Sequence, residues 1–323
     1  MRVLILGAGG FLAGWIGTSL TAAGHTAIGL SRKPPSELNG LNAHVAADRT
    51  DTAAVLGAID AHRIDTVVDL LAFTEAETAP LLAALEGRIG RYVLVSSCDV
   101  YRQYGLLHRT ERGAPPAEAI DESAAVRAAL YPYRGTQPRS PDDPARWLDD
   151  YDKLPIESRV AAADGFDWTV LRLPMVFGPG DRQRRFRWII EPMARNAATL
   201  AVPRAWAGWR TNYGYAEDVA AGIALASVHP GARRGIFNLG LDDAPAHREW
   251  ITRFATLCGW SGEVIDDCDG ATALSQLVER LDLSVPLVLS TERIRSALGY
   301  REAFDIQTAL RRTFDDEVRR GWD

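Results

Sequence analysis

The sequence predicts an α/β fold in which a doubly wound parallel sheet carries a smaller C-terminal α/β lobe. Through the first half of the chain, short and nearly continuous apolar runs alternate with segments of helical spacing, a pattern typical of parallel strands buried on both faces. A glycine-rich turn joins the first apolar run to the first helical segment. The chain has 323 residues, enough for one large domain and a smaller lobe.

The first elements form one continuous unit. We expect a strand over Arg2–Leu6, a turn over Gly7–Gly14, a helix that continues to Ala23, and a second strand over His25–Leu30. Strand, glycine turn, helix and strand within about 30 residues are the context in which a glycine motif binds a dinucleotide. We therefore predict a dinucleotide cofactor at this turn.

The residues of the turn have separate tasks. Gly7 permits the tight turn, Gly10 lets a pyrophosphate approach the backbone, and Ala13 is small enough for close packing of helix on strand. The unpaired N–H groups at the helix N-terminus then face the phosphates. We place Phe11 and Leu12 in the cofactor site as well.

The end of the second strand bears on the choice of cofactor. An acidic residue there would bind the adenosine ribose and favour NAD, whereas this chain has Ser31, Arg32 and Lys33. A hydroxyl group and two cations suit a 2′-phosphate, so we predict NADP, with NAD as the alternative. In another interpretation Arg32 only stacks on the adenine ring.

Three more strands follow at suitable spacing. They are expected over Ala43–Ala47, Thr66–Leu71 and Tyr92–Val95, with helices over Asp51–His62 and Glu75–Glu86. Sheets of this kind bind ligands beyond the carboxyl ends of their strands. The residues at these ends, which we expect to border the cofactor, are Asp48, Leu70, Leu71, Ala72, Ser96 and Ser97.

Composition narrows the classes of function. The net charge of −6 gives no support to nucleic-acid binding. The N-terminus lacks the longer apolar core of a signal peptide, and no run of about 18 apolar residues indicates a membrane span. Cys98, Cys258 and Cys268 have no paired spacing, and no cluster has metal-ligand spacing. We expect a cytoplasmic protein with no metal and with no nucleic-acid or membrane partner.

Lysine is rare in this chain, since Lys33 and Lys153 are the only lysines among 36 basic residues. Arginine is a fixed planar fork, whereas lysine is a compact point charge with a tunable pKa. A lysine in such a background suggests a position that guanidinium cannot serve. Lys153 lies in Asp149–Glu157, which has the sequence DDYDKLPIE.

Five segments, in order, resemble the short-chain dehydrogenase/reductase superfamily, and specifically its extended branch of nucleotide-sugar epimerases and dehydratases. The resemblance covers about residues 1–260. The segments are GAGGFLA at the glycine turn, SSCDVY (Ser96–Tyr101), KLPIE (Lys153–Glu157), LRLPMVFGPGD (Leu171–Asp181), and YAEDVA (Tyr215–Ala220) followed by IFNLG.

The resemblance implies roles for individual residues. Ser97 matches the serine that hydrogen-bonds a substrate hydroxyl or carbonyl, and Lys153 matches the lysine that holds the nicotinamide ribose and lowers the pKa of a catalytic tyrosine. We add Pro174 and Val176 to the cofactor-binding residues. Dehydratases of this branch have two acids after the serine or threonine position, where this chain has Cys98 and Asp99. A thiol at the first position argues against dehydration, and Cys98 is otherwise interpreted as a small buried residue.

The pattern breaks at the tyrosine. The family tyrosine lies four residues before the lysine, where this chain has Asp149, and Tyr151 is only two residues before Lys153. Pro155 disfavours helical geometry just before it, so Tyr151–Lys153 could be extended, and side chains two apart on an extended chain share a face. Tyr151 is our candidate for the acid/base; the alternatives are Tyr131 or Tyr133, Asp149, or no acid/base at all.

The long segment 103–150 is treated as an insertion that serves as a lid or an oligomer contact. We assign residues 1–177 and 211–240 to an NADP-binding Rossmann domain that carries this insertion, and residues 178–210 and 241–323 to a substrate-binding lobe.

The lobe contains two candidate substrate segments and a helical end. Arg182, Arg184, Arg185 and Arg187 form an arginine cluster that suits a pyrophosphate or carboxylate, or else a solvated face or a subunit contact. Trp206 and Trp209 suit a base or sugar, or else core packing. Thr291–Tyr300 and Phe304–Trp322 are expected to form two amphipathic helices.

The sequence thus predicts an NAD(P)-dependent oxidoreductase or epimerase of the extended short-chain type, acting on a hydroxyl or carbonyl carbon of a small molecule such as a sugar nucleotide. The alternatives are an atypical NADPH-dependent reductase of a specialised-metabolite carbonyl and a non-catalytic NADP-binding sensor or scaffold. The resemblance also implies a homodimer.

Overall fold

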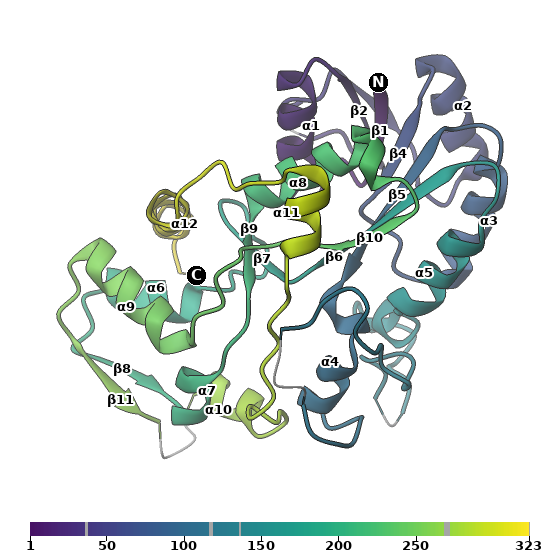
Figure 1. Cartoon of the computed structure of the whole chain (residues 1–323). Coiled ribbons are helices and arrows are strands. Elements are labelled where there is room, and N and C mark those ends of the chain that lie inside the picture. The colour runs from purple at the N-terminus through teal and green to yellow at the C-terminus, as the bar shows by residue number, and fades with distance from the viewer. Residues whose placement is uncertain (36–37, 116–118, 136, 268–271, 323) are drawn as a thin grey trace.

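A parallel sheet organises the molecule. The computed structural model describes residues 1–35, 38–115, 119–135, 137–267 and 272–322; Cys268 lies outside them. Among these residues, a seven-stranded sheet has the order β10-β6-β5-β4-β1-β2-β3 (Figure 1). Its strands are β1 (Arg2–Leu6), β2 (Thr26–Ser31), β3 (Ala43–Ala46), β4 (Thr66–Asp69), β5 (Arg91–Ser97), β6 (Asp167–Leu173) and β10 (Gly235–Asn238). The order reverses between β1 and β4, so the predicted doubly wound α/β fold is confirmed.

Helices cover both faces of the sheet because alternate strand residues point to opposite sides. Val3 and Ile5 of β1 pack into one hydrophobic cluster, and Leu4 and Leu6 pack into another. The helices on the first face are α1 (Ala13–Ala22), α8 (Ala216–Val228) and α11 (Glu292–Leu298), and those on the second are α2 (Thr52–His62), α3 (Glu75–Leu85) and α5 (Lys153–Ala162).

Strand and helix ends differ slightly from the prediction. Strand β4 stops at Asp69 instead of Leu71, and Leu70 still donates to the Leu6 carbonyl, so the chain leaves the sheet at its carboxyl edge after Leu70. Helix α2 begins one residue late because the Asp51 carboxylate accepts a hydrogen bond from the Ala54 N–H at 3.0 Å and caps the helix. These shifts leave the order of elements unchanged.

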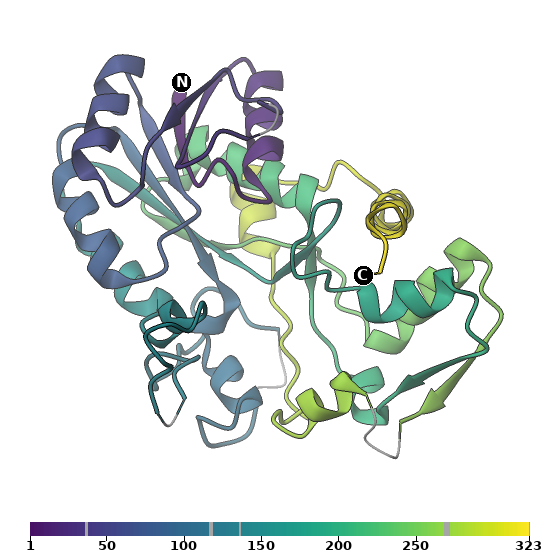
Figure 2. The same ribbon diagram turned by 180° about the vertical axis from the view of Figure 1, so that it is seen from behind.

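The other elements gather in a smaller group to one side of the sheet (Figures 1 and 2). In this group β7 (Met175–Phe177) pairs with β9 (Tyr213–Tyr215), and β8 (Thr199–Val202) pairs with β11 (Glu263–Asp266). Its helices are α6 (Arg187–Ala194), α7 (Arg204–Gly208), α9 (His247–Cys258), α10 (Ala273–Val278) and α12 (Ile306–Arg320). Helices α11 and α12 match the two predicted C-terminal helices, although Ile294 of α11 packs on the sheet.

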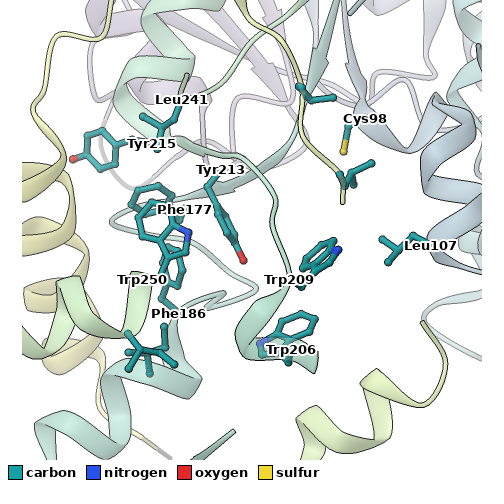
Figure 3. Close-up of a cluster of buried hydrophobic side chains, with 14 of the residues drawn as sticks. Cys98, Leu107, Phe177, Phe186, Trp206, Trp209, Tyr213, Tyr215, Leu241 and Trp250 are labelled. Carbon is teal, nitrogen blue, oxygen red and sulfur yellow. The ribbon is translucent and has the colours of Figure 1, made fainter. Parts of the chain in front are cut away.

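An aromatic core holds the smaller group together (Figure 3). Trp250, Phe186 and Tyr213 are almost fully buried, and their rings contact one another with centroids about 5 Å apart in the tilted and edge-on arrangements that aromatic pairs favour. Trp206 and Trp209 lie in the same cluster and are only 7% and 4% exposed. These two tryptophans are therefore core residues in this structure.

The insertion 103–150 packs against the body of the protein in its described parts. It includes most of α4 (Arg102–Leu107) and a 3-10 turn over Arg146–Asp149. Ile120 donates from its N–H to the Val288 carbonyl at 2.7 Å and accepts from the Ser290 N–H at 2.8 Å. Its role as a lid or an oligomer contact stays a prediction.

A search of the described helices for membrane spans found none that is both long and apolar enough to cross a bilayer.

Candidate active site

The glycine turn after β1 has the geometry that its sequence requires. Gly7 has φ of +100°, and its N–H donates to the Leu30 carbonyl at 2.9 Å, which ties the turn to β2. A Cβ on Gly7 would lie 2.9 Å from Cγ of Leu71, and one on Gly10 would lie 3.0 Å from the Gly7 carbonyl oxygen. Both positions therefore exclude larger residues.

The N-terminus of α1 is free for an anion. Leu12 occupies the capping position without a side-chain hydrogen bond, and the first turn holds no acidic residue. The first N–H groups of a helix lack internal partners and carry a partial positive charge. The turn and the helix together fit a pyrophosphate.

Two cavities run along this turn. One, of about 890 Å³, is lined by Gly7, Gly10, Ser31, Arg32, Asp48 and Leu71, all predicted cofactor residues. The other, of about 740 Å³, includes Phe11. The structure thus brings these seven predicted residues together around a space of the size that small-molecule sites have.

The cations at the end of β2 face solvent beside the first cavity. Arg32 and Lys33 are exposed, and neither takes part in an ion pair among the described residues. The Ser31 hydroxyl donates to the Lys33 carbonyl at 2.7 Å and lies 2.8 Å from His44 Nε2. Ser31 therefore shapes the loop, and the two cations remain available to an anion.

Arg182 joins these cations, although its sequence position suggested the substrate side. Its guanidinium donates to the Gly9 carbonyl at 2.8 Å, and the residue lines both cavities. The other three arginines of the cluster are bound within the protein. Arg184 pairs with Glu317, Arg185 with Asp181 and Arg187 with Glu191, each at 2.8 Å. The interpretation of the cluster as a four-arginine substrate clamp is not supported by this arrangement.

The residues that follow β3 and end β4 form hydrogen bonds beside the larger cavity. Asp48 accepts hydrogen bonds from the N–H and hydroxyl of Thr50 at 2.9 and 2.8 Å, which lower its pKa. Behind it, the buried Asp69 carboxylate binds Arg49 and the Tyr92 hydroxyl. Leu70 extends the β1 ladder through its N–H to Leu6 at 3.2 Å.

Lys153 lies where β4 and β5 end. It begins helix α5, which the Asp152 side chain caps by accepting from the Leu154 N–H at 3.0 Å. The Lys153 ammonium donates to the carbonyls of Ala72 and Val95 at 2.7 and 3.0 Å and is 3% exposed. Burial lowers its pKa to about 8.

Tyr151 accompanies Lys153 in spite of the shortened spacing. Because helix α5 starts only at Lys153, Tyr151 precedes it, and its ring centroid lies 5.7 Å from the lysine nitrogen. Its hydroxyl donates to Asp99 Oδ2 at 3.0 Å and interacts with the Ser97 hydroxyl. Ser97 in turn accepts from the Asp99 N–H at 3.2 Å. The structure thus brings Ser97, Tyr151 and Lys153 together beyond the ends of β4 and β5, at a place that we call the corner.

The alternative acid/base residues are placed differently. Tyr133 reaches the same corner and donates to Asp99 Oδ2 at 3.1 Å. Tyr131 instead packs its ring under the Arg134 guanidinium, 3.8 Å from the centroid. Asp149 accepts from the Arg139 N–H at 2.8 Å and pairs with the Arg139 and Arg146 side chains, contacts that lower its pKa. Asp149 is therefore bound within the insertion and is not at the tyrosine position of the site.

Cys98 packs in the hydrophobic core, and Glu157 forms buried polar contacts within the protein. Cys98 is buried at the edge of the aromatic cluster, on the side of Leu107 and Trp209 (Figure 3), and burial raises its thiol pKa to about 12. Glu157 accepts from the Ser96 hydroxyl at 2.5 Å and pairs with Arg172 at 2.7 Å. These contacts connect β5, β6 and α5 behind the site.

Pro174 joins β6 to β7, Val176 is the middle residue of β7, and both are buried. Val176 belongs to the cluster that Phe11 and Leu12 pack against, and its carbonyl accepts from Arg185 at 2.8 Å. Pro174 lies against Gly240, where an added Cβ would approach its Cγ to 2.7 Å. Their cofactor contact stays a prediction.

Sequence reasoning missed three neighbours of the site. Arg182 was assigned to the substrate side, and Phe73 and Trp147 were not singled out. Phe73 lines the larger cavity, and its ring contacts Trp147 and Tyr151 with centroids 5.1 and 6.0 Å away. Phe73 directly follows Ala72 at a strand end, which was the one available signal.

Comparison with known proteins identifies the family. The sequence profile of the NAD dependent epimerase/dehydratase family matches residues 3–80 and 144–240, more than half of the chain, and the unmatched stretch between them contains most of the insertion. No curated protein matches the chain.

Solved structures with the same fold include MoeE5 in complex with UDP-glucose and NAD, with 18% identity, 99% coverage of each chain and a TM-score of 0.70. The UDP-glucose 4-epimerase from Thermus thermophilus, in complex with NAD, has 22% identity, 98% coverage of this chain and 99% of that one, and a TM-score of 0.67. The UDP-glucuronic acid 4-epimerase from Bacillus cereus, in complex with UDP-glucuronic acid and NAD, has 16% identity, coverage of 99% and 100%, and a TM-score of 0.69. On the match to its profile, the chain belongs to the NAD dependent epimerase/dehydratase family.

Proposed function

We propose that this protein is an NAD(P)-dependent enzyme that oxidises and reduces a hydroxyl or carbonyl carbon of a sugar nucleotide or a related polar metabolite. The observation that carries the proposal is the corner formed by Ser97, Tyr151 and Lys153 at the carboxyl ends of β4 and β5. A hydroxyl pair beside a buried ammonium group is suited to proton transfer at a substrate oxygen.

Each of these residues has a task in the proposed reaction. A bound nicotinamide would supply hydride transfer. Tyr151 would exchange a proton with the substrate oxygen, and Ser97 would hydrogen-bond that oxygen. Lys153 would hold the nicotinamide ribose, and its charge would oppose the rise in the Tyr151 pKa that burial and Asp99 cause. Residues 178–210 and 241–323 would bind the rest of the substrate.

NADP is the cofactor that we propose, with NAD as the alternative. Arg32 and Lys33 are exposed beside the larger cavity, and Arg182 reaches the same cavity through its contact with Gly9. Three cations at one cavity suit the 2′-phosphate and pyrophosphate of NADP. The three solved structures described above contain NAD, so this proposal separates our chain from them.

The reaction class also has an alternative. The displaced tyrosine and the insertion at the corner favour an unusual substrate, such as the carbonyl of a specialised metabolite reduced by NADPH. An epimerase returns the hydride to its substrate, whereas a reductase consumes the reduced cofactor. We further propose a homodimer in the cytoplasm.

The test begins with cofactor affinity. Tryptophan fluorescence titration of the whole chain with NADP⁺, NADPH, NAD⁺ and NADH should give tighter binding of the NADP pair. The loaded protein is then incubated with UDP- and dTDP-hexoses and hexuronic acids, with product isomers followed by proton NMR and net redox followed at 340 nm. Tyr151→Phe is the matched control, because it keeps the ring and removes the hydroxyl.

Each outcome decides between the candidates. Isomer formation without net redox supports an epimerase, and NADPH loss with a carbonyl substrate supports a reductase. Binding of the cofactor without either reaction, over both substrate sets, would favour a non-catalytic sensor and overturn the enzymatic proposal. Equal or tighter binding of NAD would overturn the NADP assignment alone.

A further inference from the structure

A buried carboxylate lies directly behind the proposed catalytic tyrosine. Asp99 is 1% exposed, and its Oδ2 accepts two phenol hydrogen bonds, from Tyr151 at 3.0 Å and from Tyr133 at 3.1 Å. Its Oδ1 has no hydrogen-bond partner within the part of the chain that the structure describes. A buried polar atom without a partner is costly, so this arrangement calls for an explanation.

The second phenol comes from the insertion. Tyr133 lies outside both segments that match the family profile. Its ring packs edge-on against Tyr151 and Tyr104, with centroids 5.1 and 6.1 Å away. The insertion also fixes the backbone of Asp99, because Arg127 donates to its carbonyl at 2.7 Å while forming a buried pair with Asp152. The insertion therefore contributes directly to the corner that Tyr151 occupies.

The surroundings of Asp99 shift its pKa in opposite directions. Burial raises its pKa, whereas Arg127, the Tyr151 hydroxyl, Lys153 and the Tyr133 hydroxyl lower it. Tyr104 and Cys98 also interact with the Asp99 charge. Burial and the Asp99 charge raise the pKa values of Tyr151 and Tyr133 well above 10. Both phenols donate their hydrogen bonds to the same carboxylate oxygen, so the geometry makes Asp99 the acceptor for either hydroxyl.

We propose that Asp99 is the proton acceptor behind Tyr151, and that Tyr133 is a positioning residue that holds Asp99 for this task. The inference rests on the proposed function. During substrate oxidation, the substrate hydroxyl proton moves to the Tyr151 oxygen as the Tyr151 proton moves to Asp99, and the hydride passes to an oxidised nicotinamide dinucleotide. The reverse step returns both. Because Asp99 is buried, the proton is held away from solvent between the two half-reactions.

The inference can be tested without a substrate. Carbon-13 NMR of aspartate side chains follows the Asp99 titration in the whole, cofactor-free chain, and Asp99→Asn identifies its signal. Tyr133→Phe removes one charge-assisted hydrogen bond from the carboxylate, so Asp99 should titrate roughly one pH unit higher. Tyr131→Phe is the matched control from the same loop, and it should leave the Asp99 titration where the wild type has it.

If Tyr133→Phe fails to fold, a second measurement on the wild-type protein tests the same inference. In the wild-type protein, the Cζ signal of Tyr133 should change as Asp99 titrates, and that of Tyr131 should not. Identical Asp99 titrations in Tyr133→Phe, Tyr131→Phe and wild type, or a Tyr133 signal that ignores Asp99, would overturn the inference.

Kinetics separate this inference from the proposed function. With a turned-over substrate, Tyr133→Phe should move the acidic limb of the kcat profile to higher pH, recover kcat at alkaline pH and keep cofactor affinity. A uniform loss of kcat at every pH would indicate a merely structural role and contradict the inference. Turnover retained in Tyr151→Phe would instead refute the assignment of Tyr151 in the proposed function.

Discussion

The two ends of the cofactor site are built in opposite ways. At the glycine turn, neighbouring residues in the sequence form the site, and its cations Arg32 and Lys33 are exposed without ion pairs among the described residues. At the proposed catalytic corner, separate segments supply Ser97, Tyr133 and Tyr151, which surround the buried Asp99 carboxylate. The first end is ready for an anion, whereas the second is already filled with its own hydrogen bonds.

The two ends therefore depend on different kinds of constraint. The turn depends on backbone geometry at Gly7 and Gly10, where a side chain would collide with its neighbours. The corner depends on bringing a hydroxyl next to Lys153, and more than one backbone path can do that. Here Tyr151 precedes the extended capping residue Asp152, and Tyr133 of the insertion packs against the Tyr151 ring.

The largest effect should come from the corner. Tyr151→Phe should lower kcat by roughly 10²- to 10⁴-fold, the range for loss of a general acid or base, while cofactor affinity stays unchanged. Asp149→Asn is the comparison, since Asp149 pairs with Arg139 and Arg146 away from Tyr151, and it should retain most of the turnover. A larger loss of kcat in Asp149→Asn than in Tyr151→Phe would instead assign the acid/base role to Asp149, four residues before Lys153.

A substitution beside the glycine turn should change the affinity for the cofactor. Arg32→Ala removes a cation that the proposal places at the 2′-phosphate, so NADPH affinity should fall about 10- to 100-fold with little change for NADH. Isothermal titration calorimetry with both cofactors measures the ratio. Equal losses for the two cofactors would mean that Arg32 contacts a feature common to both, such as the adenine ring.

A smaller effect should appear in the pH dependence of cofactor binding. Burial lowers the Lys153 pKa to about 8, so the ammonium is charged below that pH and neutral above it. The dissociation constant for NADP⁺ should therefore rise several-fold between pH 7 and pH 9. Lys153→Met, which is neutral throughout, should bind more weakly at pH 7 and show a flat profile. A flat profile in the wild type would contradict the assigned ribose contact.

The smallest effect is expected in the arginine cluster. Arg187 pairs with Glu191 one helical turn away, and both side chains are partly exposed. Arg187→Ala should change the free energy of unfolding by only about 0–1 kcal/mol, as surface pairs do, and leave cofactor affinity unchanged. Urea denaturation and the same calorimetry measure both. Loss of substrate affinity in this variant would revive the interpretation of the cluster as a substrate clamp.

The sequence predicted the parts that depend on nearby residues. The strands, the helices and the glycine turn could be predicted from local periodicity. The cations beside the larger cavity could be predicted from the adjacent residues Ser31, Arg32 and Lys33. The predicted effect of Pro155 was only partly right: Asp152 is extended, but the helix begins at Lys153, so Lys153 and Leu154 are helical despite the proline that follows them. Tyr151 could therefore be selected, but only as one of several candidates.

The remaining features depend on partners far away in the chain. Arg184 pairs with Glu317, and Arg182 reaches back to Gly9, so periodicity within the segment 182–187 could not separate a bound arginine from a free one. In the same way, the sequence contains Tyr131 and Tyr133 two residues apart, but it does not show which of them contacts Asp99. Left-handed backbone at Tyr131, with φ of +56°, accompanies the difference between these neighbours.

A structure of the protein with NADP bound tests the central claim most directly, by the distance from each candidate oxygen to C4 of the nicotinamide. The account predicts the Tyr151 hydroxyl at roughly 4–5 Å from C4, with Ser97 beside it and the Lys153 ammonium within hydrogen-bonding distance of the ribose. A nicotinamide ring placed away from Tyr151, with Lys153 still bound only to the carbonyls of Ala72 and Val95, would contradict the claim that this displaced tyrosine forms the catalytic pair with Lys153.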